Sequence, residues 1–208
     1  MESKLFRGDN LMAKYSANVV SVSFWYSEFS QIVDLVVKRN TWPEIKSMAV
    51  EDNYFKQSSK ARSLDMYRQL KLRIDTLDTD YLELFSSLDI SNQKIINLVS
   101  IMNIDKLFSE FMYESFRNEL LLGDSKLYDY EVQSFFDRKQ AENEQVAGWT
   151  DVTVKRLAGS YLAFLREAGL LTDEGEYDDV KRPLIDLRLQ DLMVEQNDNV
   201  ALASLLGR

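Results

Sequence analysis

WPEIKSMAVEDNYFKQSSKARSLDMYRQLKLR, residues Trp42–Arg73, predicts a short helix, a connection and a longer basic helix. Thr41 precedes the stretch as a capping residue, Pro43 stands where the first turn tolerates proline, and Glu44 adds an acid there. These residues indicate a helix start, because the first turn has free N–H groups that a hydroxyl and a carboxylate satisfy. We therefore expect a helix that begins there and ends at about Asp52.

The longer helix of this stretch is amphipathic. Ser58 or Ser59 can cap its start, and its apolar residues recur at steps of three and four, which predicts one buried face. That face consists of Leu64, Tyr67, Leu70, Ile74 and Leu77. Arg62, Gln69 and Arg73 follow one another at steps of seven and four, so we expect them to share the outward face.

Charge reverses within the same stretch. Between Lys56 and Arg73 stand six Lys or Arg residues and the single acid Asp65, so this segment carries +5 in a chain of net charge -9, and the remainder sums to -14. Clustered cations on one helix predict contact with a polyanion, because attraction to phosphate follows local charge rather than overall pI. A helix whose charges serve only its solubility is the alternative.

Composition excludes many kinds of chemistry. The chain has 208 residues, is 45% hydrophobic and contains neither cysteine nor histidine. Disulfides, thiolate or imidazole metal sites, histidine bases and cysteine nucleophiles are therefore absent. No glycine-rich phosphate loop occurs. The triplet Glu44–Lys46 matches the acid and lysine spacing of metal-dependent nucleases only weakly, so we expect a protein that is not an enzyme and needs no cofactor or metal.

Hydropathy predicts a protein without membrane contact. The first ten residues lack the apolar core of a signal peptide. The apolar segment Asn18–Phe29 is interrupted by Ser and Glu and falls short of the ~18 apolar residues that a membrane span requires. We expect a cytoplasmic monomer.

The rest of the chain predicts an all-α protein. Trp25, Phe29, Ile32 and Val36 form the stripe of a first helix, capped by Ser21 or Ser23. Further helices are expected at Asp80–Leu88, Asn92–Met102, Asp105–Leu122, Tyr128–Asn143, Val152–Ala168, Pro183–Gln196 and Val200–Leu206. Gly123 and Gly169 are the expected helix stops. Glu144–Trp149 is expected as a loop. The acidic run Thr172–Asp179 is expected as a solvated loop that either forms a short wing or is disordered.

This pattern predicts a compact multi-helix globular protein in three parts. Residues 1–77 form an N-terminal helix-turn-helix-like lobe, with a connection at 52–57 that is longer than the usual three or four residues. Residues 78–128 are packing helices. Residues 129–208 form a C-terminal helical lobe that contains a second helix-turn-helix-like pair.

Four segments match a known family in order and spacing. They are Lys14–Ser16, Trp42–Ile45, Ser59–Arg73 and Trp149–Leu171 (WTDVTVKRLAGSYLAFLREAGLL). Through them the chain resembles BrxA, a core component of bacteriophage exclusion (BREX) defence systems, over residues 12–171. The resemblance implies an all-helical DNA-binding accessory protein of bacteria, with helix-turn-helix elements, that works beside a DNA methyltransferase, ATPase partners and other BREX subunits.

We predict that double-stranded DNA contacts the first helix pair. The second pair, Asp129–Asn143 with Val152–Ala168, either binds DNA weakly or packs against a partner, and which pair dominates DNA contact stays open. Residues able to reach a groove are Ser59, Lys60, Arg62 and Gln69. Residues directed to phosphates are Lys56, Arg68, Lys71 and Arg73, and the second pair adds Lys155 and Arg156. Arg and Lys outnumber Asn and Gln in this set, which favours backbone affinity over base specificity. The alternative is a protein-protein adaptor of the same complex without direct DNA contact.

Overall fold

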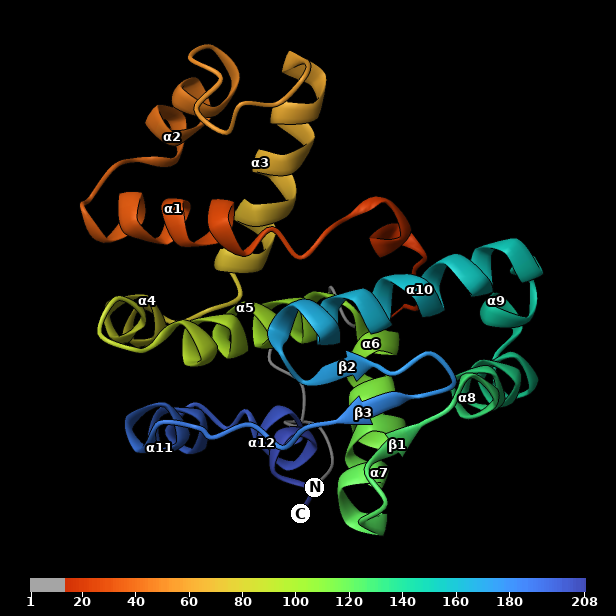
Figure 1. Ribbon diagram of the computed structural model, residues 1–208. Helices are drawn as coiled ribbons and strands as arrows, with labels where there is room; N and C mark the ends of the chain where they lie inside the picture. The colour runs from red at the N-terminus through yellow and green to blue at the C-terminus, as the bar shows by residue number, and fades with distance from the viewer. Residues whose placement is uncertain (1–13) are drawn as a thin grey trace.

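The structure, a computed structural model that describes residues 14–208, is built mainly from helices, as the sequence predicts (Figure 1). The helices of the first half are η1 (Asn18–Ser21), α1 (Tyr26–Val37), α2 (Trp42–Val50), α3 (Lys60–Ile74), α4 (Thr79–Phe85) and α5 (Ile90–Ile104). Those of the second half are α6 (Lys106–Phe111), η2 (Met112–Phe116), α7 (Arg117–Leu122), α8 (Asp129–Glu142), α9 (Glu144–Ala147), α10 (Asp151–Ala168), α11 (Leu187–Glu195) and α12 (Asn199–Leu206).

Helices α1, α2 and α3 form a lobe at one end of the molecule, at the top of Figure 1. The predicted start of α2 is confirmed, because Thr41 and Glu44 form a capping box in which the Thr41 N–H donates to the Glu44 carboxylate at 2.7 Å. The connection at residues 51–59 is longer than a helix-turn-helix turn. Ser59 is the cap of α3, and its hydroxyl oxygen accepts the N–H of Arg62 at 3.3 Å.

The start of α1 differs from the prediction. Neither Ser21 nor Ser23 caps it, and the helix follows Trp25, whose φ of 50° is left-handed. The reason is the preceding residue: Phe24 is fully buried and its carbonyl accepts bonds from α3 and α5, so the chain must turn sharply after it. Phe29 and Ile32 are buried as predicted, whereas Trp25 and Val36 are partly buried.

The centre of the molecule is α5, which packs against α1, α3, α4, α6 and α10. Nine of its residues are buried, so apolar side chains surround it rather than follow one stripe. Helix α6, the π-helical turn η2 and α7 continue one another over residues 106–122 and end at Gly123, which has a left-handed φ of 85°. This run is the helix expected at Asp105–Leu122, and its Phe108 and Phe116 are fully buried in the core.

A small antiparallel sheet was predicted only in part, because a short wing was one expectation for the acidic run but its pairing with a third strand was not expected. It comprises β1 (Lys126–Leu127), β2 (Leu171–Asp173) and β3 (Asp178–Val180), in the order β1-β3-β2. Leu171 pairs with Val180, and the acidic run between them closes a hairpin in which the Glu174 N–H donates to the Tyr177 carbonyl at 2.9 Å. Of the two expectations for this run, the structure has the short wing.

Two other boundaries also differ. The expected loop Glu144–Trp149 contains the short helix α9. Helix α11 begins at Leu187 rather than at Pro183, because the Asp186 carboxylate caps it by accepting the Arg188 N–H at 2.9 Å. In the described residues, no helix is long and apolar enough to cross a membrane.

Candidate nucleic-acid interface

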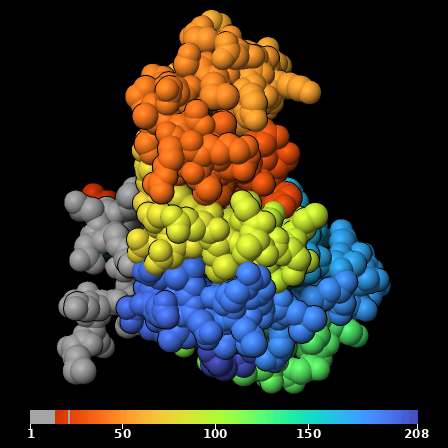
Figure 2. All heavy atoms as spheres, turned by 90° about the vertical axis from the view of Figure 1, so that its left-hand side faces the viewer, coloured from red at the N-terminus to blue at the C-terminus, as the bar shows by residue number. Residues whose placement is uncertain are grey.

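Four of the predicted contact residues lie together at the outer end of the N-terminal lobe. We call Lys56, Ser59, Lys60 and Arg62 the basic tip. All four are exposed, on the α2–α3 connection and the first turn of α3. Figure 2 shows that α2 and α3 project beyond the rest of the molecule at this end. The basic tip is therefore open to a large ligand.

The connection that carries Lys56 is held against α3. Phe55 is buried in the core. The Asn53 side-chain oxygen accepts the N–H of Gln57 at 2.8 Å and the hydroxyl of Ser63, on α3, at 3.2 Å. Both Asn53 and Lys56 have left-handed backbones, with φ of 50° and 52°. These contacts fix the backbone that presents the Lys56 side chain.

The electrostatics of the basic tip favour an anion. The first turn of a helix presents free N–H groups and the positive end of the helix dipole. Lys60 forms an exposed ion pair with Glu51, and such pairs are weak, worth ~0–1 kcal/mol. Lys56 and Arg62 have no ion-pair partner within residues 14–208. Two unpaired cations and one weakly paired cation thus surround the start of α3.

Farther along α3 the predicted contact residues have partners in the lobe. Arg68 lies 3.4 Å from the Asp65 carboxylate. Lys71 forms an ion pair with Asp75, and its ammonium lies 4.5 Å from the centre of the Trp42 ring. Gln69 is half-buried. Lys71 and Gln69 are therefore less available to a ligand than the basic tip, whereas Arg68 stays exposed in an ion pair as weak as that of Lys60.

Arg73 contradicts the prediction of an outward face. Its side chain is fully buried, and its guanidinium donates to the carbonyls of Phe24 at 2.9 Å and Ser23 at 2.8 Å. The reason is that α3 is open to solvent at its start, whereas α1, α5 and the segment before α1 cover its end. Burial lowers the pKa of Arg73 to about 9, with a smaller opposing effect from Glu167. Arg73 is a core residue and does not belong to the interface.

The second predicted surface lies on α10. Lys155 and Arg156 are exposed in the first half of this helix, and neither forms an ion pair in the described part of the chain. Arg166, near the other end of α10, already has an ion-pair partner. Its guanidinium donates to both carboxylate oxygens of Asp178, at 2.7 and 2.8 Å.

The Arg166–Asp178 ion pair joins the β2–β3 hairpin to α10. Sequence reasoning missed this pair, since no local pattern links residues 12 positions apart across a glycine stop. The hairpin itself presents the exposed acids Glu174 and Glu176. It therefore adds negative charge beside α10.

The groove between α8 and α10 has a different character from the basic tip. Its volume is about 680 Å³, and the charged residues that line it are Asp129, Asp137, Asp151 and Lys155. Three carboxylates against one ammonium disfavour a polyanion inside it. Any contact of α10 with DNA must use the side of the helix that carries Arg156.

The acid of the triplet Glu44–Lys46 has a structural role. The Glu44 carboxylate accepts bonds from both the N–H and the hydroxyl of Thr41 at 2.7 Å, and these bonds lower its pKa. Among residues 14–208, no three Asp or Glu side chains converge on a position that holds a metal ion.

Comparisons with known proteins agree on one family. The family model described as BrxA matches residues 13–197. A relative from Bacillus cereus (strain H3081.97), described as BREX protein BrxA, is 29% identical over 193 residues, covering 93% of this chain and 96% of the relative. The crystal structure of an uncharacterized protein from Magnetospirillum magneticum has a TM-score of 0.77 at 16% identity, covering 93% of this chain and 99% of that chain. This last likeness concerns the fold alone.

Proposed function

This chain belongs to the BrxA family, and from that premise we propose that it is a non-enzymatic subunit of a bacterial BREX phage-defence system that binds duplex DNA. The observation that carries the proposal is the basic tip, where Lys56, Lys60 and Arg62 surround the start of α3 on a chain of net charge -9. A local excess of cations attracts phosphate whatever the net charge of the whole protein. We infer that the protein acts as a cytoplasmic monomer alongside other BREX subunits.

Binding should depend little on DNA sequence. The basic tip offers two Lys residues and one Arg, and phosphate contacts position a protein without reading bases. Arg62 is the member of the tip able to pair with a guanine edge. The half-buried Gln69 is less available for an adenine. We therefore assign most of the affinity to the phosphate backbone.

The second contact in this proposal is the unit formed by β1, α8, α9, α10, β2 and β3. We infer that this unit is a helix-turn-helix with a wing, and its element order and its sheet order β1-β3-β2 support the inference. In such motifs the helix that follows the turn enters the major groove. Here that helix is α10, so Arg156 would reach DNA, whereas Lys155 lines the acidic α8–α10 groove and the acidic wing would face away from the duplex.

The proposal is tested by binding of labelled duplex to the pure protein over a salt series. Lys56→Glu together with Arg62→Glu should weaken binding by about tenfold or more for unrelated sequences. The dependence of log affinity on log salt should flatten by roughly 0.9 for each phosphate that the variant no longer neutralises. Both positions are exposed and outside the core, so the melting temperature should be unchanged.

A single reversal gives the matched control. Arg62→Glu is compared with Lys181→Glu, which changes the net charge equally at an exposed position after the wing. The neighbouring Arg182 is unsuitable, because its guanidinium donates to the backbone carbonyls of Leu120 and Leu206. Equal losses of affinity in the two single variants would show that only overall charge matters and would contradict a DNA surface at the tip.

A protein-protein adaptor is the second candidate function. The observation that favours it is the α8–α10 groove, where three Asp side chains suit a basic partner segment. Salt-sensitive binding of duplex by the isolated protein supports the first candidate. Binding of a BREX subunit without any duplex binding supports the adaptor.

A further inference from the structure

Three exposed apolar side chains gather where the segment before α11 meets the start of α5. Leu184 is 92% exposed, Leu187 73% and Ile90 62%. We call these three residues the Leu184 patch. They lie outside the core and on elements that carry neither candidate DNA surface. Apolar residues that gather at one place on a surface, rather than standing singly, are typical of a site that binds another molecule.

The backbone that presents the Leu184 patch is held by side-chain contacts. The buried Asn92, in the first turn of α5, donates its amide to the Leu184 carbonyl at 3.3 Å. The side-chain oxygen of Asn92 accepts the Asp186 N–H at 2.9 Å. Arg188 donates to the hydroxyl of Ser87 at 3.0 Å, which ties α11 to the end of α4. A partner therefore meets a preformed surface and need not order it.

Acidic side chains surround the patch. The two segments that form this face, residues 79–92 and 184–196, contain six acids and the single cation Arg188, so their net charge is -5. Arg188 is already paired with Asp186 at 2.7 Å. Figure 2 shows α4 and α11 side by side on the side turned to the viewer. Five of the acids are exposed and form no ion pair among residues 14–208: Asp80, Glu83, Asp89, Asp191 and Glu195.

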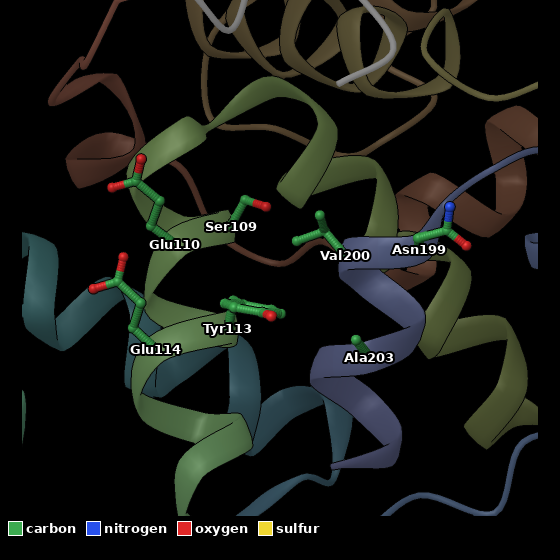
Figure 3. A pocket seen from close by; sticks show the side chains of 7 residues that line it. All are labelled: Ser109, Glu110, Tyr113, Glu114, Asn199, Val200 and Ala203. Atoms are coloured by element: carbon green, nitrogen blue, oxygen red, sulfur yellow. The ribbon is translucent and has the colours of Figure 1, made fainter. Parts of the chain in front are cut away.

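The groove between α6–η2 and α12 shows how paired acids differ from these. Two of the residues that line it are Glu110 and Glu114, and Figure 3 shows both side chains pointing away from α12. The Lys139 ammonium lies 2.8 Å from the first carboxylate and 2.6 Å from the second, so it neutralises part of their charge. The acids around the Leu184 patch lack such a cation, and their field therefore extends into the solvent.

We propose that the Leu184 patch and the acids around it bind a basic amphipathic segment of another BREX subunit. The proposal rests on the place that we assign to this chain among the subunits of such a system. Because the patch shares no element with the basic tip or with α10, one copy can hold the subunit and duplex DNA together.

Charge decides the class of partner. The phosphates of DNA and the head groups of anionic lipids would be repelled by five unpaired carboxylates. A protein segment with Lys or Arg beside apolar side chains satisfies both parts of the surface. Its apolar residues cover the Leu184 patch, and its cations lie opposite the acids. A helix with apolar residues at steps of three and four and cations beside them has this pattern.

Photo-crosslinking tests the proposal in cells that express the chain together with the other subunits of its BREX system. The photoreactive residue p-benzoylphenylalanine replaces Leu187. The matched control carries it at Leu122, which is 75% exposed at the end of α7. Both changes replace an exposed leucine by another apolar residue, so charge and fold are kept. Mass spectrometry identifies the crosslinked peptide.

We expect a crosslink to another protein at Leu187 that is about tenfold more abundant than at Leu122, in a peptide with more Lys and Arg than Asp and Glu. A yield no higher than that of the control would overturn the proposal. Crosslinks to a second copy of this chain, to nucleic acid, to lipid or to an acidic peptide would overturn it as well.

Charge reversals give the second measurement. Glu83→Lys with Asp191→Lys should lower the Leu187 crosslink about tenfold, because like charges then face each other. The matched control reverses Glu174 and Glu176, two exposed acids of the wing, and so has the same net charge. Equal losses in the two variants would contradict docking at the patch. Duplex binding is measured separately on the unmodified protein: its absence would overturn the DNA-binding proposal while leaving a Leu187 crosslink valid.

Discussion

Arg73 shows how one charged residue becomes part of the core. Its guanidinium satisfies the carbonyls of Ser23 and Phe24, residues 50 and 49 positions earlier in the chain. The exposed Arg62 lies three helical turns before it on the same face of α3, so helical periodicity cannot distinguish the two. Only the packing of distant segments over the end of α3 decides which cation meets solvent.

Asp105 is a buried acid with a structural role. It caps α6, and its Oδ1 accepts the Phe108 N–H at 2.8 Å and the Tyr161 hydroxyl at 3.2 Å. Its other oxygen is buried without a hydrogen-bond partner among residues 14–208. Burial raises the pKa of Asp105 from 3.8 to about 6, against the smaller opposing effects of these hydrogen bonds.

This raised pKa gives a prediction of pH dependence. The folded state holds the proton more tightly than the unfolded state, so the contribution of Asp105 to stability is largest at low pH and falls as pH rises from about 4 to about 6. Asp105→Asn keeps the cap but cannot ionise. Between pH 4 and 7.5 the variant should gain up to about 3 kcal/mol of unfolding free energy relative to wild type.

Urea unfolding of both proteins at pH 4.5, 6 and 7.5 measures this gain. Other groups titrate in the same range, but they are common to both proteins, so the difference between the two curves isolates Asp105. If the unfolding free energies of wild type and variant changed with pH by the same amount, the Asp105 carboxyl would be ionised in the folded protein throughout this range.

At the scale of elements, helices were predictable and strands were not. Long apolar periodicity and local caps identify helices such as α3 and α10, and Gly123 and Gly169 end their helices as expected. Strands β2 and β3 have three residues each, too few to show an alternating pattern. The pairing of β3 with β1 also requires residues about 50 positions apart to meet, which no local signal records.

The helix α10 offers a paired prediction, because it contains one glycine and ends at another. Gly169 has a left-handed φ of 80°, and a Cβ at this position would meet no atom within 4 Å, so any penalty on substitution comes from the backbone. Gly169→Val should destabilise the protein by about 1 kcal/mol or more. Gly159 lies inside the helix with open space around it, so Gly159→Ala should stabilise by about 0.5–1 kcal/mol. Thermal unfolding of both variants checks the opposite signs.

At the scale of the whole molecule, one core connects the two candidate DNA surfaces. Nearly all buried apolar residues of the described chain belong to one cluster, in which α3 packs on α5 and α5 packs on α10. This shared core therefore fixes the position of the basic tip relative to Lys155 and Arg156. The candidate contact residues were predicted from charge and spacing, but their availability depended on this packing, as the buried Arg73 shows.

A cycle of charge reversals tests how the two surfaces share one duplex. One variant reverses Lys56 and Arg62, a second reverses Lys155 and Arg156, and a third combines all four changes. We expect the first to bind DNA more weakly than the second, because the acids of the α8–α10 groove and the wing already oppose phosphate near α10. Since the two surfaces share no residues, their effects on the binding free energy should add within about 0.5 kcal/mol.

Salt slopes measured on one duplex of fixed length distinguish the outcomes of this cycle. If both surfaces touch the duplex, the combined variant flattens the slope by the sum of the two separate changes, at roughly 0.9 for each phosphate that is no longer neutralised. If the combined variant binds like the variant of the basic tip alone, α10 makes no DNA contact. The α8–α10 groove would then be free for a basic protein partner while the basic tip holds DNA.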